Sequence, residues 1–74
     1  MEEVDVWELS MRSEYRRVLE KSGIRVLDVY RRKDRDSVRF LYRGKVHVVD
    51  LKGFYDSVKP EELLNVLLSQ VEGR

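Results

Sequence analysis

The stretch Ser37–Tyr55, SVRFLYRGKVHVVDLKGFY, predicts a β-hairpin around which the rest of the chain is organised. Its two arms are rich in β-branched and aromatic residues, and apolar side chains recur in each arm with the period of two that a strand requires. Between the arms, Arg43-Gly44-Lys45 is expected to turn the chain. Gly44 supplies the positive φ that a tight hairpin turn needs. The returning arm then runs from Val46 to Leu51.

A third strand and a final helix are expected beside the hairpin. The segment Ile24 to Arg31 alternates between two sets of side chains, so it predicts a strand that precedes the hairpin. Pro60 suits the first turn of a helix, where its missing N–H costs little. That last helix is expected to bury one stripe of side chains, formed by Leu63, Leu64, Leu67, Leu68 and Val71.

The beginning of the chain predicts another helix. Asp5 and Glu8 have the spacing of a capping box, so the helix is expected to start near Val6 and to end at Gly23. Its buried stripe is expected to contain Trp7, Met11, Tyr15, Val18 and Leu19. The predicted order is helix, three antiparallel strands, helix. This αβββα pattern is an α+β fold in a single small domain that covers residues 1–74.

Length and composition narrow the class of protein. A chain of 74 residues is close to the size at which one core is only just sufficient. Cysteine is absent and His47 is the sole histidine, so neither disulfides nor a structural zinc site is expected. The apolar runs are too short to cross a membrane and the acidic start is unlike a signal peptide. We therefore expect a soluble, cytoplasmic protein without a cofactor.

Charged residues are abundant but nearly balanced. They make up 39% of the chain and sum to a net charge of +1, a balance common in proteins of hyperthermophiles, so a thermophilic and archaeal source is expected. A near-neutral sum argues against general coating of nucleic acids. Basic side chains are nevertheless concentrated in one loop, which leaves a contact with DNA open as an alternative. These loop residues are Arg31, Arg32, Lys33 and Arg35.

One face of the predicted sheet is a candidate binding surface. If both helices cover the same face, the other face is left open, and an apolar centre rimmed by arginine is typical of a site for a protein partner or a second copy. The centre is expected to contain Leu27, Val29, Leu41, Val49 and Leu51. Its rim is expected to contain Arg25, Arg31, Arg39, Arg43 and His47. The alternative is one helix on each face, which would bury both.

A second pattern resembles the PD-(D/E)xK nuclease superfamily. Asp36 and the triplet Asp50-Leu51-Lys52 match the acidic residues and the lysine that this family carries on adjacent strands, and Glu14 falls where many members have a further acid. The resemblance implies a divalent metal held by Asp36, Asp50 and Glu14 beside Lys52. The alternative is that Asp50 and Lys52 are solvated charges at the end of a strand.

Two further resemblances concern binding rather than catalysis. The segment from Val48 to Tyr55 resembles the clamp-binding box of partners of the sliding clamp PCNA, which implies that Leu51, Phe54 and Tyr55 share one face of a 3-10 turn. In size, composition and this box the chain is similar to small archaeal inhibitors of the clamp. The alternative is that both aromatic residues belong to the core. The order of elements also resembles the double-stranded RNA-binding domain, although Lys59-Pro60-Glu61-Glu62 is acidic where that family is basic.

The sequence therefore predicts a small protein-binding regulator of a DNA replication or repair factor such as the sliding clamp, without catalysis of its own. A minimal metal-dependent nuclease and a nucleic-acid-binding module are the alternatives. A second copy of the chain is a further candidate partner, which would give a homodimer. The predicted partner-binding residues are Leu41, Val49, Leu51, Phe54, Tyr55, Arg39 and Arg43.

Overall fold

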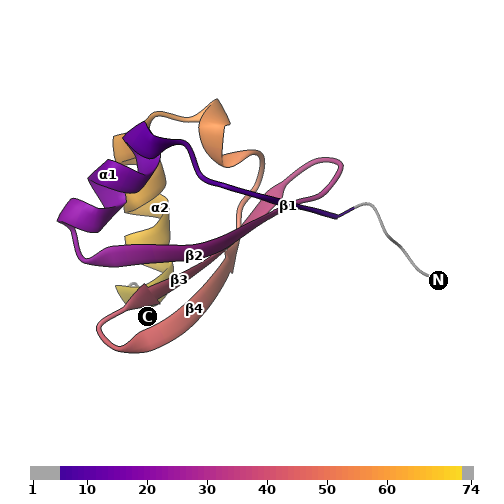
Figure 1. Ribbon diagram of the computed structural model, residues 1–74. Helices are drawn as coiled ribbons and strands as arrows, with labels where there is room; N and C mark the ends of the chain where they lie inside the picture. Colours follow the sequence, from indigo (N-terminus) through magenta and orange to yellow (C-terminus); the bar gives the residue numbers. More distant parts are fainter. Residues whose placement is uncertain (1–5, 73–74) are drawn as a thin grey trace.

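A four-stranded antiparallel sheet carries two helices on one of its faces in the computed structural model, which describes residues 6–72 (Figure 1). The strands follow one another across the sheet in the order β1-β2-β3-β4. In chain order the elements are β1 (Trp7–Leu9), α1 (Ser13–Lys21), β2 (Ile24–Arg31), β3 (Asp36–Tyr42), β4 (Lys45–Asp50), the 3-10 turn η1 (Tyr55–Ser57) and α2 (Pro60–Glu72). The predicted α+β class is confirmed, and the predicted number of strands is wrong by one.

The additional strand, β1, occupies the region where a helix was predicted to begin. Trp7 pairs with Arg31 and Leu9 pairs with Val29, so residues 7–9 extend the sheet along the edge of β2. Helix α1 begins only at Ser13, and Trp7 is 55% exposed rather than part of a buried stripe. Pairing with β2 satisfies the backbone groups of these residues, which a helix would have had to satisfy internally. Asp5, the first member of the predicted capping box, lies outside the described residues.

Helix α1 still buries the later part of its predicted stripe. Tyr15 and Leu19 are buried, Val18 is partly exposed, and Gly23 follows the helix with a φ of 86°. This left-handed conformation is the usual end of a helix. The hydroxyl of Tyr15 donates a hydrogen bond of 2.5 Å to the carbonyl of Val58, which ties α1 to the segment before α2.

The turn between β3 and β4 contains two residues, not the predicted three. Arg43 has a φ of 54° and Gly44 a φ of 78°, and two successive positive φ angles are the signature of a type I′ hairpin turn. Lys45 already belongs to β4 and pairs with Tyr42. Because a turn shorter by one residue shifts the pairing by one, Leu41 lies opposite Val46.

Strand β2 contains a bulge that interrupts its alternation. Val26 pairs with Phe40 and Asp28 with Arg39, so Leu27 is the extra residue. From Asp28 onward the side chains of β2 therefore face the opposite way from the one that uninterrupted alternation predicts.

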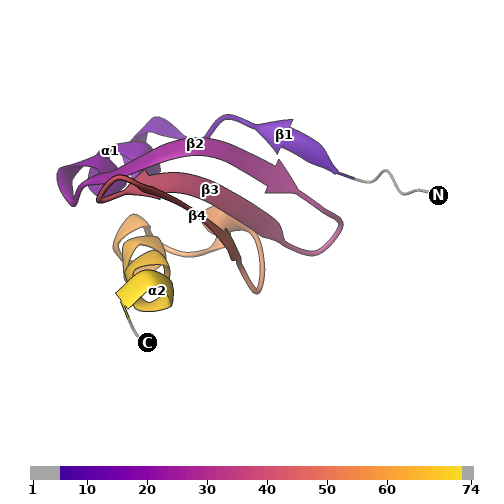
Figure 2. The same ribbon diagram turned by 90° about the horizontal axis from the view of Figure 1, so that it is seen from below.

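The core lies between the sheet and the two helices. Figure 1 shows α1 and α2 on the same side of the sheet, and Figure 2 shows the strongly twisted strands from below, with β4 nearest to α2. Helix α2 buries Leu63 and Leu67 completely, with Leu64, Leu68 and Val71 packed partly against the same core, so its predicted stripe is confirmed. The sheet contributes Ile24, Val29, Val38, Phe40, Tyr42 and Val49. Because both helices pack on one face, no described element covers the other face of the sheet.

Candidate protein-binding surface

We call this uncovered side of the sheet the open face. Its side chains come from alternate positions of the strands, as fixed by the pairing of Arg25 with Leu41, of Arg39 with Val48 and of Leu41 with Val46. It consists of Glu8, Arg25, Leu27, Asp28, Tyr30, Ser37, Arg39, Leu41, Val46, Val48 and Asp50.

An apolar strip crosses the open face and reaches the edge of the sheet. Val48 is 62% exposed and Val46 is 53% exposed, both on β4, while Leu41 on β3 is half-buried and Leu27 at the bulge is exposed. These four side chains form the apolar strip. Full burial of a valine side chain contributes about 1.5 kcal/mol, so exposing two of them on one strand leaves a substantial gain for any partner that covers them.

A charged pair flanks the apolar strip. The Nε of Arg39 donates a hydrogen bond of 2.7 Å to Asp28, whose side chain is 15% exposed against 43% for Arg39. The hydrogen bond from Arg39 lowers the pKa of Asp28, and the same bond raises the pKa of Arg39. The bond with Asp28 orients the guanidinium of Arg39, which lies opposite Val48 in the sheet.

The structure divides the predicted binding residues between the two faces. Leu41 and Arg39 lie on the open face, as expected. Val49 and Leu51 were predicted beside them and are instead buried in the core, because the two-residue turn places Val46 and Val48 on the open face in their stead. A sequence prediction with a type I′ turn at Arg43-Gly44 would have found these two valines.

Other predicted members of the open face also belong to the helix side. Val29 is fully buried, as the bulge at Leu27 requires, and Arg31 pairs with Asp36 on the same side. His47 is half-buried and stacks on Phe40, with ring centroids 5.5 Å apart. Arg43 lies in the turn, where its guanidinium is 5.1 Å from the centre of the Tyr42 ring.

Arg31 and Asp36 form the centre of a polar cluster under the sheet. Asp36 is completely buried, and Arg31 binds both of its carboxylate oxygens at 2.8 and 2.9 Å. The backbone N–H of Tyr55 donates a further bond of 2.9 Å to Asp36, and Arg31 also contacts Asp56 at 3.2 Å. The hydrogen bond with Asp36 raises the pKa of Arg31, which therefore stays charged. Asp36 therefore anchors the segment before α2.

The residues of the nuclease resemblance are not brought together. Asp36 faces the helix side, whereas Asp50 pairs with Ser37 in the ladder, accepts a hydrogen bond from its hydroxyl and lies on the open face. Glu14 is exposed on α1. Within residues 6–72, no group of three histidine, aspartate or glutamate side chains is placed to hold a metal ion.

The clamp-binding box is largely built into the fold. Leu51 is buried, and so is Tyr55, whose hydroxyl accepts a hydrogen bond of 2.9 Å from the backbone N–H of Arg12. Tyr55 also meets Tyr15 edge to face, with ring centroids 5.2 Å apart. Phe54 is the half-exposed member of the three, and the guanidinium of Arg31 lies 4.4 Å from its ring centre. A 3-10 turn follows at Tyr55–Ser57, but two of the three anchors face the core.

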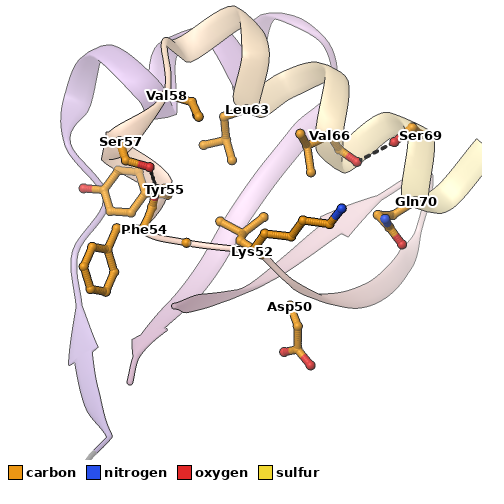
Figure 3. A pocket seen from close by; sticks show the side chains of 12 residues that line it. Asp50, Lys52, Phe54, Tyr55, Ser57, Val58, Leu63, Val66, Ser69 and Gln70 are labelled. Atoms are coloured by element: carbon orange, nitrogen blue, oxygen red, sulfur yellow. Dashed lines mark hydrogen bonds between the residues drawn. The ribbon is translucent and has the colours of Figure 1, made fainter. Parts of the chain in front are cut away.

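A groove runs between α2 and the segment that joins β4 to η1 (Figure 3). It has a volume of about 360 Å³, and Leu51, Leu63 and Val66 contribute apolar walls. Figure 3 shows Lys52 extending across the mouth toward α2, while Asp50 points away from it. The groove thus lies at the edge of the sheet formed by β4, on the helix side.

No known protein family, curated protein or solved structure was found to match this chain. Among the described residues, none of the helices has the length and apolar character needed to cross a membrane. The functional interpretation therefore rests on the geometry of the open face, the edge of β4 and the groove.

Proposed function

We propose that this chain is a small protein-binding regulator that acts through the open face and has no catalysis of its own. The observation that carries the proposal is the apolar strip, which leaves Val46 and Val48 more than half exposed on a face that no described helix covers. A contiguous exposed apolar strip on a small protein marks an interaction site, and arginine is among the residues enriched in binding hot spots.

The physical basis of binding would be burial of the apolar strip together with hydrogen bonding by Arg39. An arginine that acts as a hot spot near the centre of an interface contributes about 2 kcal/mol or more, and full burial of a valine or leucine side chain contributes about 1.5 kcal/mol or more. Asp28 already neutralises part of the charge of Arg39, which lowers the cost of bringing this pair into an interface.

The test compares the wild-type protein with Leu41→Glu as bait for proteins from the source organism, followed by titration of each captured protein in purified form. Leu41 is half-buried on the open face, so a carboxylate there places charge in the middle of the apolar strip. We expect binding to weaken by about 100-fold, equivalent to roughly 2.7 kcal/mol, while the circular dichroism spectrum is unchanged.

Arg17→Glu is the matched control because it adds a carboxylate to an exposed position of α1, on the other side of the molecule. Binding that survives Leu41→Glu but not Arg17→Glu would refute the proposed site.

The sliding clamp is the first purified partner to titrate, because the clamp-binding box of the sequence ends at η1. In this structure Phe54 is the accessible residue of that box, so Phe54→Ala tests the clamp contact without disturbing the buried Tyr55. If the clamp binds the wild type and Phe54→Ala equally, its contact does not use the box.

A further inference from the structure

Strand β4 is the last strand of the sheet, and within residues 6–72 no strand pairs with its outer side. In a two-residue hairpin the two residues that flank the turn exchange both of their backbone hydrogen bonds. The backbone N–H and C=O of Lys45 therefore point toward Tyr42 of β3. Pairs alternate along the ladder, and the amide and carbonyl groups of Val46, Val48 and Asp50 therefore point away from β3. Leu51, which donates a hydrogen bond of 2.8 Å to the carbonyl of Asp36, fits this alternation. Three residues of β4 thus present backbone donors and acceptors to an incoming strand.

The two sides of this edge have different chemistry. Val46 and Val48, exposed on the open face, continue the apolar strip to the edge. On the helix side the edge carries Lys45 and His47, and Lys52 lies at the mouth of the groove. A strand pairs each residue with an opposite residue on the same face. The best complement is consequently an extended segment with apolar side chains opposite Val46 and Val48 on the open face and acidic side chains on the helix side.

A second copy of β4 fits this edge less well. Two copies of β4 could pair antiparallel about a two-fold axis. The register in which Val46, Val48 and Asp50 all form hydrogen bonds places Val48 opposite Val48 of the second copy. It then puts Val46 opposite Asp50 of the second copy and Lys45 opposite Leu51 of the second copy. In this register Lys45 and His47 lie opposite Leu51 and Val49 of the second copy, so neither meets an acidic side chain. The pattern of charges therefore favours a partner of different sequence.

We propose that the partner contributes an extended segment of alternating apolar and acidic residues, which pairs with β4 as a fifth strand. This inference rests on the proposed protein-binding function and specifies the chemistry of the partner. The apolar residues of the segment pack on Val46 and Val48, and its acidic residues face Lys45, His47 and Lys52. The groove beside α2 accommodates side chains that reach past the edge.

The probe is a fluorescent peptide of about eight residues in which valine and glutamate alternate, a length matched to a typical strand. We expect it to bind at least about tenfold more tightly than the same peptide with lysine in place of glutamate, a difference of roughly 1.4 kcal/mol. The difference is expected to shrink as salt is added, because exposed charges are screened. Equal affinity for the two peptides would overturn the proposed acidic chemistry.

Backbone N-methylation of the peptide tests strand pairing directly. In antiparallel addition, the residues that exchange hydrogen bonds with Val46 and Val48 have their side chains on the open face, so these are the valines of the peptide. Methylation of the valine nitrogens is expected to abolish binding, whereas methylation of the glutamate nitrogens is expected to leave it within about twofold. The same effect from both sets would refute pairing along one edge.

Two variants of the protein complete the test. Val48→Pro removes the donor that faces the free edge but no hydrogen bond to β3, and proline is tolerated at such edge positions. Lys52→Glu reverses the charge at the groove, with Arg17→Glu as its control. We expect both Val48→Pro and Lys52→Glu to weaken binding of the valine–glutamate peptide by about tenfold or more. Unchanged affinity in Lys52→Glu would contradict the proposal even if Val48→Pro fails to fold.

Failure of this inference is distinguishable from failure of the proposed function. If the protein partner depends on Leu41 but the peptide does not bind, the open face is the binding site and strand addition is wrong. If the partner is indifferent to Leu41→Glu, the proposed function is wrong and strand addition, which rests on it, falls with it.

Discussion

Arg39 binds one aspartate, Asp28, whereas Arg31 binds both Asp36 and Asp56, and the surroundings of the Arg31–Asp36 and Arg39–Asp28 pairs differ. Asp36, the partner of Arg31, is fully buried, whereas Asp28 and Arg39 lie on the open face. We expect Arg31→Met to lower the free energy of unfolding by about 3 kcal/mol, because it leaves a buried carboxylate without its counter-charge. Urea denaturation followed by circular dichroism measures the change.

Arg39→Met is the matched control for this substitution and is expected to cost less than Arg31→Met, because water still reaches the Arg39–Asp28 pair and screens it. Equal costs for the two variants would show that Asp36 does not depend on Arg31.

Tyr42 links the end of β3 to the last turn of α2. Its hydroxyl donates a hydrogen bond of 2.7 Å to Glu72, and this bond raises the pKa of Tyr42. A raised pKa in the folded state means that the stabilisation is complete below the unfolded value of about 10 and is lost as the pH rises through the folded value. We expect the melting temperature to fall above about pH 10, and to fall less in Tyr42→Phe. A melting temperature that falls more steeply with pH in Tyr42→Phe than in the wild type would contradict this prediction.

Asp36 and Asp50 cannot share a metal ion in this fold, since they lie on opposite faces of the sheet. We therefore expect no magnesium- or manganese-dependent cleavage of single-stranded, double-stranded or supercoiled DNA by the purified protein. Gel assays at several protein concentrations measure this. Cleavage that disappears in Asp50→Ala would replace the binding interpretation with the nuclease alternative.

At the scale of the elements, the turn between β3 and β4 decides which residues reach the open face. Gly44 has a φ of 78°, and no heavy atom lies within 4 Å of the Cβ that a larger residue would add. The cost of Gly44→Val is therefore one of backbone conformation, about 1–2 kcal/mol, and is expected to appear in the free energy of unfolding.

Gly53→Ala is the control for the turn, because Gly53 lacks a positive φ and its added Cβ would meet only the Ser57 hydroxyl at 3.8 Å. It is expected to change stability by less than about 0.5 kcal/mol. A Gly44→Val variant as stable as wild type would mean that the turn adopts another conformation in solution.

The same elements show how far the sequence could predict this site. The alternation of β3 and β4 and the positive φ of Gly44 were correctly predicted, because they depend on neighbouring residues. Turn length and the bulge at Leu27 were not, and each reverses the faces of every residue beyond it. Val49 was therefore expected on the open face and Val48 was not, although both are valines of one strand. Pairing across strands, which local sequence does not encode, made the difference.

At the scale of the whole molecule, the sequence predicted the class of fold but not the full width of the sheet. Helix α2 was predicted correctly because its leucines recur at the spacing of one helical face. Strand β1 contains three residues, too few for alternation to distinguish it from the first turn of a helix. Its identity depends on β2 offering an unpaired edge, a tertiary effect that overrides the local signals near Trp7.

The presence of β1 also limits how many molecules can join the sheet. One edge is closed by a strand of three residues, which offers few hydrogen bonds, while β4 offers a strand of six. Of the two edge strands that the structure describes, β4 is the longer, so an added segment is expected to prefer it. Titration calorimetry with the valine–glutamate peptide should accordingly saturate at an equimolar ratio. We expect the molecule to end β-sheet extension after a single addition at β4 rather than to seed fibrils.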